Sequence, residues 1–194
     1  MTSGPTSSGP AGSSRPEHGT RTGRTGLLLR VSGLPGSGKT TLLEAAHARA
    51  EIAPISRDLI RAELFPVSRP HTARETELAF DVMLTTARSR LRAGDRVSLD
   101  GCCFARPRQR DRARKLADEA GARLIGVHLE IPASEAARRV GAPSDHPAND
   151  RDADLVARVA GYLAPAEPDD LVIDATLPPD EIWALLSQRL SRPD

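Results

Sequence analysis

The sequence has 194 residues, with 27 Lys and Arg against 26 Asp and Glu, and a formal net charge of +1. This length suffices for one domain with a complete hydrophobic core. The near balance of positive and negative charges argues against a nucleic-acid coat or a membrane-surface protein. No apolar run approaches the ~18 residues that cross a membrane, and the first residues lack the apolar core of a signal peptide, so we expect a cytoplasmic protein.

Residues 1–26 form the first segment of the chain and consist mostly of Gly, Ser, Thr and Pro. Such a composition has no apolar periodicity and cannot bury enough surface to offset the entropy of the chain. We therefore predict a disordered tail over residues 1–26 and a folded domain over residues 27–190.

From Leu27 onward, strand and helix patterns alternate along the chain. Helical periodicity predicts helices over about residues 40–50, 71–93 and 106–120, and two more that begin at Pro132 and Pro178. Short apolar runs predict five strands, at residues 27–32, 52–56, 96–100, 123–131 and 171–174. Strands separated by long helices predict an α/β fold of three α/β/α layers around a five-stranded parallel sheet, whose ligands bind at the carboxyl ends of the strands.

A phosphate-binding motif follows the first predicted strand, because residues 33–40 satisfy G-x-x-x-x-G-K-[ST] before a predicted helix. Glycines allow backbone N–H groups to point at phosphate oxygens, and the start of the helix adds a partial positive charge. Lys39 would reach the β- and γ-phosphates, and the Thr40 hydroxyl would bind Mg²⁺. The motif predicts a P-loop NTPase with a site for ATP and Mg²⁺, formed by Gly33, Pro35, Gly36, Ser37, Gly38, Lys39, Thr40 and Thr41.

A second group of charged residues follows the second predicted strand, in the segment Ser56-Arg57-Asp58-Leu59-Ile60-Arg61. Asp58 and Arg61 are three residues apart and would share one face of a helical turn. Asp58 could accept a proton from an attacking hydroxyl, and Arg61 could hold an anionic part of the acceptor. Alternatively, Asp58 caps a helix and Arg61 is a surface charge, and the spacing does not separate these interpretations.

Asp100 ends the third predicted strand, as the acidic residue of a Walker B segment does. It could hold Mg²⁺ through the water shell of the ion or face the acceptor, and a plain turn with Gly101 is the alternative. Cys102 and Cys103 follow directly. Adjacent cysteines have no zinc-ligand spacing and rarely bridge each other, so we expect two small apolar residues with free thiols.

Together, residues 33–41, Ser56-Arg57-Asp58 and Arg61 resemble the P-loop kinase group, of the AAA type, that includes polynucleotide 5′-kinase, chloramphenicol phosphotransferase and zeta toxin. The resemblance covers about residues 27–175 and extends through Leu99-Asp100-Gly101 to the arginines at 138–139. It implies that the aspartate at position 58 activates the acceptor hydroxyl and that the arginine at position 61 contacts the acceptor.

The resemblance also implies a small lid, in which an arginine stabilises the transferring phosphoryl group and the closed site excludes water. The candidates are Arg138, Arg139 and Arg151, of which we assign Arg139 as catalytic. The lid arginine of the group usually lies in a denser Arg-rich run. Here residues 142–147 interrupt such a run, so the sequence does not decide which arginine acts.

These patterns predict an ATP-dependent kinase that transfers the γ-phosphoryl group to a hydroxyl, with Asp58 as the base. The balanced charge and the small number of aromatic residues favour a small-molecule acceptor over a 5′-hydroxyl nucleic acid. A regulatory NTPase without a phosphorylated acceptor is the alternative, although no Gln or Glu follows Asp100 to orient a water molecule. The identity of the acceptor and the oligomeric state stay open.

Overall fold

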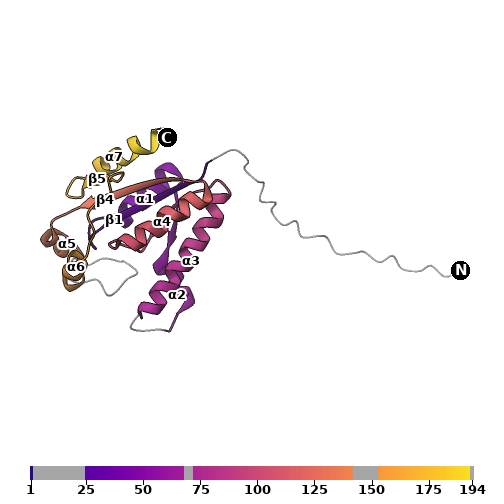
Figure 1. The fold of residues 1–194 in the computed structure, drawn as a ribbon, viewed down its shortest axis with the longest axis horizontal. Helices are drawn as coiled ribbons and strands as arrows, with labels where there is room; N and C mark the ends of the chain where they lie inside the picture. Colours follow the sequence, from indigo (N-terminus) through magenta and orange to yellow (C-terminus); the bar gives the residue numbers. More distant parts are fainter. Residues whose placement is uncertain (2–24, 68–71, 142–152, 193–194) are drawn as a thin grey trace.

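The computed structural model describes Met1 and residues 25–67, 72–141 and 153–192, so the predicted tail lies almost entirely outside the described residues. Its sheet has the strand order β2-β3-β1-β4-β5, and every neighbouring pair is parallel (Figure 1). The prediction of a five-stranded parallel sheet is confirmed. The strands are β1 (Leu27–Gly33), β2 (Ala53–Ser56), β3 (Arg96–Asp100), β4 (Arg123–Glu130) and β5 (Leu171–Asp174).

Among the described residues, helices connect successive strands, and one more helix follows the last strand. Three of them, α2, α5 and α6, are eight residues long. Of these, α2 and α6 were not predicted as helices, because eight residues make little more than two helical turns. The helices are α1 (Lys39–Ala50), α2 (Arg57–Leu64), α3 (Ala73–Arg92), α4 (Pro107–Ala120), α5 (Ala133–Val140), α6 (Ala153–Ala160) and α7 (Pro179–Ser191).

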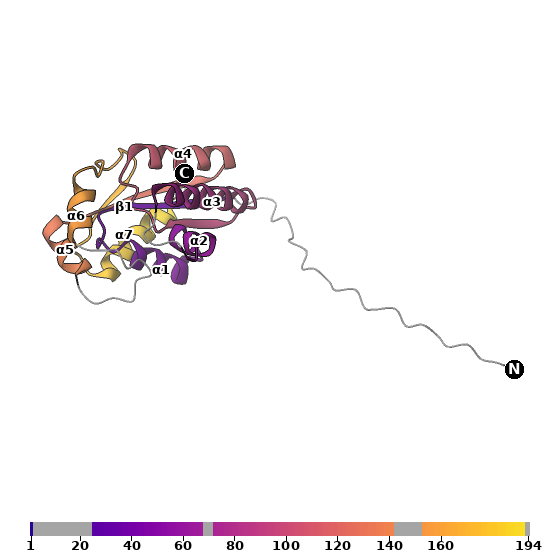
Figure 2. The same ribbon diagram turned by 90° about the horizontal axis from the view of Figure 1, so that it is seen from below.

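Helices cover both faces of the sheet, which confirms the three predicted layers. Figure 2 shows α4 above β1, and α1 and α7 below it. The two faces follow from the alternation of side chains along β1, since Leu27, Leu29 and Val31 join one core cluster and Leu28 joins the other. A third, smaller cluster joins α5 and α6 at one end of the sheet, around Leu34.

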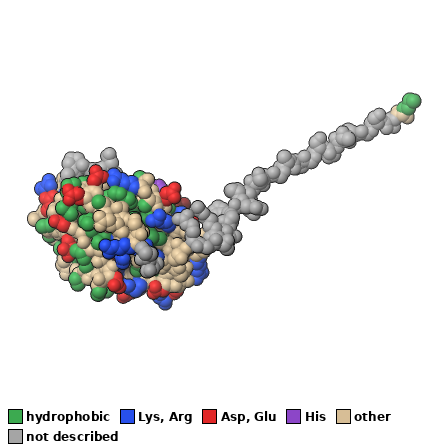
Figure 3. All heavy atoms as spheres, turned by 90° about the horizontal axis from the view of Figure 1, so that it is seen from above, with side chains coloured by type: hydrophobic (Ala, Val, Ile, Leu, Met, Phe, Trp, Pro, Cys, Tyr) green, Lys and Arg blue, Asp and Glu red, His purple; other side chains and the backbone are tan. Residues whose placement is uncertain are grey.

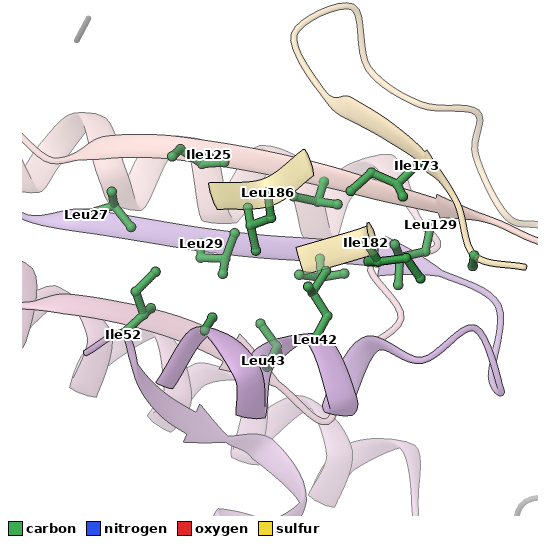
Figure 4. Packing of buried hydrophobic residues seen from close by; sticks show 14 residues of the cluster. Leu27, Leu29, Leu42, Leu43, Ile52, Ile125, Leu129, Ile173, Ile182 and Leu186 are labelled. Carbon is green, nitrogen blue, oxygen red and sulfur yellow. The ribbon is translucent and has the colours of Figure 1, made fainter. Parts of the chain in front are cut away.

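The core between the sheet and the helices α1 and α7 is built from aliphatic side chains (Figure 4). Leu42 and Leu43 project from α1, and Ile182 and Leu186 project from α7, toward Leu29 on β1. Complete burial of each such side chain contributes about 1.5–3 kcal/mol to folding. This packing fixes the start of α1, and with it the segment that carries the phosphate-binding motif.

The opposite face of the sheet also carries a buried arginine, Arg30, whose exposed fraction is 1%. Its Nη1 lies 2.6 Å from Oε2 of Glu167, and its Nη2 donates a hydrogen bond to Asp170. Gly126 on β4 leaves the space that this group needs, because a Cβ there would lie 1.9 Å from Oδ1 of Asp170. We call Arg30, Glu167 and Asp170 the Arg30 cluster.

Arg110, which is also buried, connects the segment before β5 to the loop after β3. Its Nε donates to the Phe104 carbonyl at 2.7 Å, and its Nη2 donates to the Ala164 carbonyl at 2.8 Å. The Ala164 N–H in turn donates to the Ala105 carbonyl at 2.8 Å. The segment between α6 and β5 is thus held against the loop between β3 and α4.

The surface in Figure 3 carries Lys and Arg side chains interspersed with Asp and Glu, in keeping with the balanced composition of the chain. Within the described ranges, no helix combines the length and the apolar character needed to cross a bilayer.

Candidate functional site

A pocket of about 750 Å³ opens at the carboxyl ends of the strands. Residues 35–40 of the phosphate-binding motif line it. On what we call the α2 side, the pocket is lined by Arg57, Asp58, Arg61, Thr76, Gly101, Cys102, Cys103, Arg106, Gln109 and Tyr162. On the α7 side it is lined by Arg49, Arg139, Ala175, Leu177, Pro179, Asp180, Ile182 and Trp183.

The backbone of the phosphate-binding motif has the conformation that its glycines allow. Gly36 and Gly38 have φ values of +80° and +87°, which residues other than glycine rarely adopt. A Cβ at Gly36 would also lie 2.5 Å from the Ala136 carbonyl oxygen on α5. The N-cap position of α1 supplies no side-chain hydrogen bond, so N–H groups at the start of the helix are available to an anion.

Seven of the eight residues predicted to bind the nucleotide line this pocket, and Gly33 does not. Gly33 instead fills a structural position, because its N–H donates to the Cys103 carbonyl at 3.2 Å. A Cβ there would lie 2.7 Å from the Leu129 carbonyl oxygen. Ser37 has a buried hydroxyl without a hydrogen-bond partner among the described residues, which is what a phosphate oxygen would satisfy.

Lys39, Thr40 and Asp100 come together at the base of the pocket. The Lys39 ammonium donates to the carbonyls of Gly33 at 3.1 Å and Leu34 at 2.6 Å, which holds it along the motif. The Thr40 hydroxyl donates to Oδ1 of Asp100 at 3.3 Å. Side by side, a hydroxyl and a carboxylate offer the oxygen ligands that Mg²⁺ prefers. The described residues contain no group of three or more His, Cys, Asp or Glu that could hold a metal, so a cation here would also need phosphate oxygens.

Asp58 lies on the first turn of α2, but it is not the N-cap of that helix. Ser56 occupies the cap, and its hydroxyl accepts a hydrogen bond from the Leu59 N–H at 3.4 Å. Asp58 and Arg61 each have an exposed fraction of 8% and both line the pocket. The alternative of a capping aspartate with a surface arginine is therefore wrong.

Two arginines surround the Asp58 carboxylate. Nη2 of Arg57 lies 3.2 Å from Oδ1 of Asp58, and Nη2 of Arg61 lies 3.6 Å from the same oxygen. We call Arg57, Asp58 and Arg61 the Asp58 cluster. Two positive charges beside one carboxylate leave this side of the pocket with an excess of positive charge.

Strand pairing brings Asp58 and Asp100 to the same edge of the sheet. In the β2–β3 register, Ser56 is opposite Asp100, so the residues after each strand are neighbours. Gly101 has a φ of +74°, and a Cβ there would lie 3.0 Å from Cγ of Asp58. The close approach of Gly101 leaves little freedom for the Asp58 carboxylate.

The two cysteines are free and follow Asp100 into the pocket wall. Cys102 is buried in the core, and burial raises the pKa of its thiol to about 11. A thiol with so high a pKa stays protonated at neutral pH and is a poor nucleophile. The expectation of two small residues with free thiols is confirmed, although Cys103 also lines the pocket.

Of the three candidate lid arginines, Arg139 is the one that lines the pocket, whereas Arg151 lies outside the described residues. The Arg139 guanidinium donates to Oε1 of Glu135 and to the Ala175 carbonyl, both at 2.9 Å. Arg138 donates to Glu135 at 2.7 and 2.8 Å, and its side chain is 72% exposed. Hydrogen bonds from Arg138 and Arg139 lower the pKa of Glu135 to about 2.

Several lining residues were not anticipated from the sequence. Trp183 packs against the core but is only partly buried and lines the pocket, with the Arg49 guanidinium 5.7 Å from the centre of its ring. The apolar periodicity of α7 marks its buried face but does not show that the pocket shares one edge of that face. Arg106 and Tyr162 lie outside every motif, and no pattern in the sequence singles them out.

The comparisons with known proteins agree with this geometry. A family model described as an AAA domain matches residues 28–165, which is more than half of the chain. No curated protein matches the sequence significantly.

Solved structures with the same fold include several kinases. A gluconokinase from Sinorhizobium meliloti is 22% identical, with a TM-score of 0.60 over 86% of this chain and 97% of its own. The Mycobacterium tuberculosis APS kinase in complex with AMPPNP and APS is 18% identical, with a TM-score of 0.65 over 88% and 100% of the two chains. A tunicamycin resistance protein from Deinococcus radiodurans is 16% identical, with a TM-score of 0.61 over 87% and 97%. At these identities the similarity establishes the P-loop kinase fold that the motifs indicated.

Proposed function

This chain belongs to the AAA domain family of P-loop proteins, and from that premise we propose that it is an ATP-dependent kinase that phosphorylates a hydroxyl group. One observation carries the proposal: the Asp58 carboxylate lines the same pocket as Lys39, Thr40 and Asp100, from the neighbouring strand ends. A regulatory NTPase would instead need a Gln or Glu after Asp100 to orient a water molecule, and Gly101, Cys102 and Cys103 follow it here. We assign this activity to residues 27–190.

In the proposed reaction, ATP binds with its phosphates along residues 33–41. Asp58 orients the acceptor hydroxyl and takes its proton, while the oxygen attacks the γ-phosphorus and the bond to the β-phosphate oxygen breaks. Lys39 and Arg139 offset the negative charge that develops on the transferring group. Thr40 and Asp100 would hold Mg²⁺, which when bound neutralises charge on the phosphates.

A small hydroxyl-bearing molecule is our preferred acceptor. The gluconokinase and the APS kinase of the same fold are named for small acceptors, and the APS kinase structure contains APS beside the ATP analogue AMPPNP. The formal charge of this chain, +1, also offers little to a nucleic-acid backbone. A nucleic-acid acceptor would show itself by a steep fall of affinity with salt.

The experiment that tests the proposal compares the wild-type protein with Asp58→Asn. We measure ADP formation with ATP and Mg²⁺ against a panel of sugars, sugar acids, nucleosides and antibiotics, together with the binding of ATP. General base catalysis typically contributes 10²–10⁴-fold, so Asp58→Asn should lose about 10²–10⁴-fold in transfer while it retains its affinity for ATP.

Asp111→Asn is the matched control, because Asp111 is exposed on α4 and lies outside the pocket. It should transfer phosphate at the wild-type rate. A regulatory NTPase would behave differently, since no acceptor would accelerate ADP formation and hydrolysis would be insensitive to Asp58. Full transfer activity in Asp58→Asn would refute the role of this residue.

A further inference from the structure

The α2 side of the pocket extends beyond Asp58 to an arginine and a tyrosine that no motif includes. The Arg106 guanidinium carbon lies 4.8 Å from the centre of the Tyr162 ring, and both residues line the pocket. Arg106 comes from the N-cap position of α4, and Tyr162 follows α6. An arginine above a tyrosine ring is held by the attraction between its charge and the electron-rich face of the ring.

The backbone on both sides of this pair is fixed. The residue before Arg106, Ala105, accepts the hydrogen bond of the Ala164 N–H at 2.8 Å. Arg110 connects the same two segments through the carbonyls of Phe104 and Ala164. The Arg106 N–H itself donates to the side chain of Gln109 at 3.2 Å. The backbone that carries the pair is thus preformed, while the two side chains are exposed and accessible to a ligand.

Arg106 differs from the other arginines of the α2 side in its charge balance. Arg57 and Arg61 both lie beside the Asp58 carboxylate. Arg106, in contrast, is exposed, lines the pocket and forms no ion pair with any described residue. The Nε atoms of Arg57 and Arg61 are also buried without a hydrogen-bond partner in the described structure. The α2 side therefore offers more N–H donors and positive charge than the protein itself satisfies.

We propose that Arg106, supported by the Tyr162 ring, binds an anionic group of the acceptor, so that the acceptor is an alcohol that also bears a carboxylate, a phosphate or a sulfate. The inference rests on the proposed function, because it names the substrate class of that same pocket. A guanidinium presents two parallel N–H donors that match the oxygens of these three anions. Arg106 would select the acceptor, while Asp58 acts on its hydroxyl.

A titration of Arg106 itself tests the anion site without any need for turnover. In ¹⁵N-labelled protein, the Nε–Hε signal of Arg106 is assigned through its loss in Arg106→Lys. Sodium sulfate, sodium acetate and sodium phosphate are then added at constant ionic strength, with and without AMPPNP and Mg²⁺. We expect a saturable shift of this signal with at least one of the anions and none with chloride, and the anion that saturates first identifies the preferred group.

The kinetic test uses acceptor pairs that differ in one charged group: an aldonic acid against the alditol of the same chain length, and a nucleoside 3′-phosphate against the nucleoside. We expect the wild type to prefer the anionic member of a pair. Hydrogen bonds to a charged group contribute enough that Arg106→Met should raise the KM for the anionic member about 10- to 100-fold. The KM for ATP should not change, and Arg106→Lys should retain part of the preference.

Three further variants separate the binding role from a structural one. Arg108→Met is the matched control, since Arg108 lies on the same helix, is exposed and does not line the pocket. Tyr162→Phe keeps the ring and should behave as the wild type, whereas Tyr162→Ala should raise the KM for the anionic acceptor without a change in kcat. Thermal unfolding verifies that each variant is folded.

The outcomes distinguish this inference from the proposed function. If neutral acceptors are phosphorylated efficiently and no anion shifts the Arg106 signal in a saturable way, the anion site is refuted while the kinase activity stands. If no acceptor is phosphorylated but an anion saturates the Arg106 signal, the site is supported and the kinase assignment fails. Equal loss of activity toward both members of a pair in Arg106→Met would also overturn the inference.

Discussion

The molecule contains two buried groups of arginine and carboxylate that look alike in composition but differ in the balance of their charges. In the Arg30 cluster, two carboxylates share one arginine, and Arg114 reaches Glu167 from outside at 2.9 Å. In the Asp58 cluster, two arginines share one carboxylate. The first lies away from the large pocket, and the second lines it. A buried arginine alone therefore does not mark a site.

The two clusters differ in the net charge that remains when their arginines and carboxylates are counted together. Buried charges are costly to remove from water, so a cluster without a ligand must compensate its charges within the protein. The Arg30 cluster does so, and it connects the centre of the sheet to the segment before β5. The Asp58 cluster retains a positive excess that faces open space. We infer that the first stabilises the fold and the second binds a ligand, and three variants test this contrast.

The largest effect on stability should come from Arg30→Met. This change leaves the Asp170 carboxylate buried without its arginine, and the loss of one partner of a buried ion pair costs about 3–5 kcal/mol. Urea unfolding followed by circular dichroism measures the free energy of unfolding. Arg49→Met, which removes an exposed ion pair with Asp180, should lose no more than about 1 kcal/mol. Equal losses in the two variants would contradict the structural role of the Arg30 cluster.

Arg61→Met should affect catalysis more than stability. Arg57 remains 3.2 Å from Asp58 and still compensates its charge, so we expect a smaller loss of stability than in Arg30→Met. The kcat/KM for the acceptor should fall by about 10- to 100-fold, the contribution of a charged hydrogen bond. Arg112→Met is the control, because Arg112 pairs with Glu77 and Asp81 outside the large pocket. An unchanged kcat/KM in Arg61→Met would show that Arg61 does not bind the acceptor.

The smallest effect should be a change in the acid sensitivity of folding in Glu167→Gln. Burial works to raise the pKa of Glu167, but Arg30 and Arg114 outweigh it, and the folded-state pKa lies below the ordinary value. The ionised Glu167 thus stabilises the protein above the unfolded pKa of about 4.3, and this stabilisation disappears as the pH falls through the folded pKa. Unfolding at pH 7 and at pH 4 should show a smaller loss on acidification in Glu167→Gln than in the wild type.

Sequence patterns predicted the sheet and the place of the phosphate-binding motif between β1 and α1 because both depend on local order. The motif at residues 33–40 requires only a strand before it and a helix after it, and these leave clear periodic signals. Asp58 was a weaker prediction, since spacing could not separate a helix cap from a base. That question depended on the β2–β3 register and on Ser56, which takes the cap.

Arg106 and Tyr162 could not be predicted because they are 56 residues apart and meet only through tertiary contacts. Their neighbours in the chain show no periodicity that points to a pocket. The Arg30 cluster could not be predicted either, because its central residue is an arginine at a buried strand position where the pattern favours an apolar residue. Its partners in the segment before β5 are more than 130 residues away, and Gly126 provides the space between them.

The close approach of Gly36 to the Ala136 carbonyl has a mechanical consequence. A side chain at position 36 would collide with α5, so the helix that carries Arg139 has little room to shift toward the loop. Arg139 is three residues beyond that contact. The closest approach of this helix to a bound triphosphate is therefore limited by a backbone contact that is made when the chain folds.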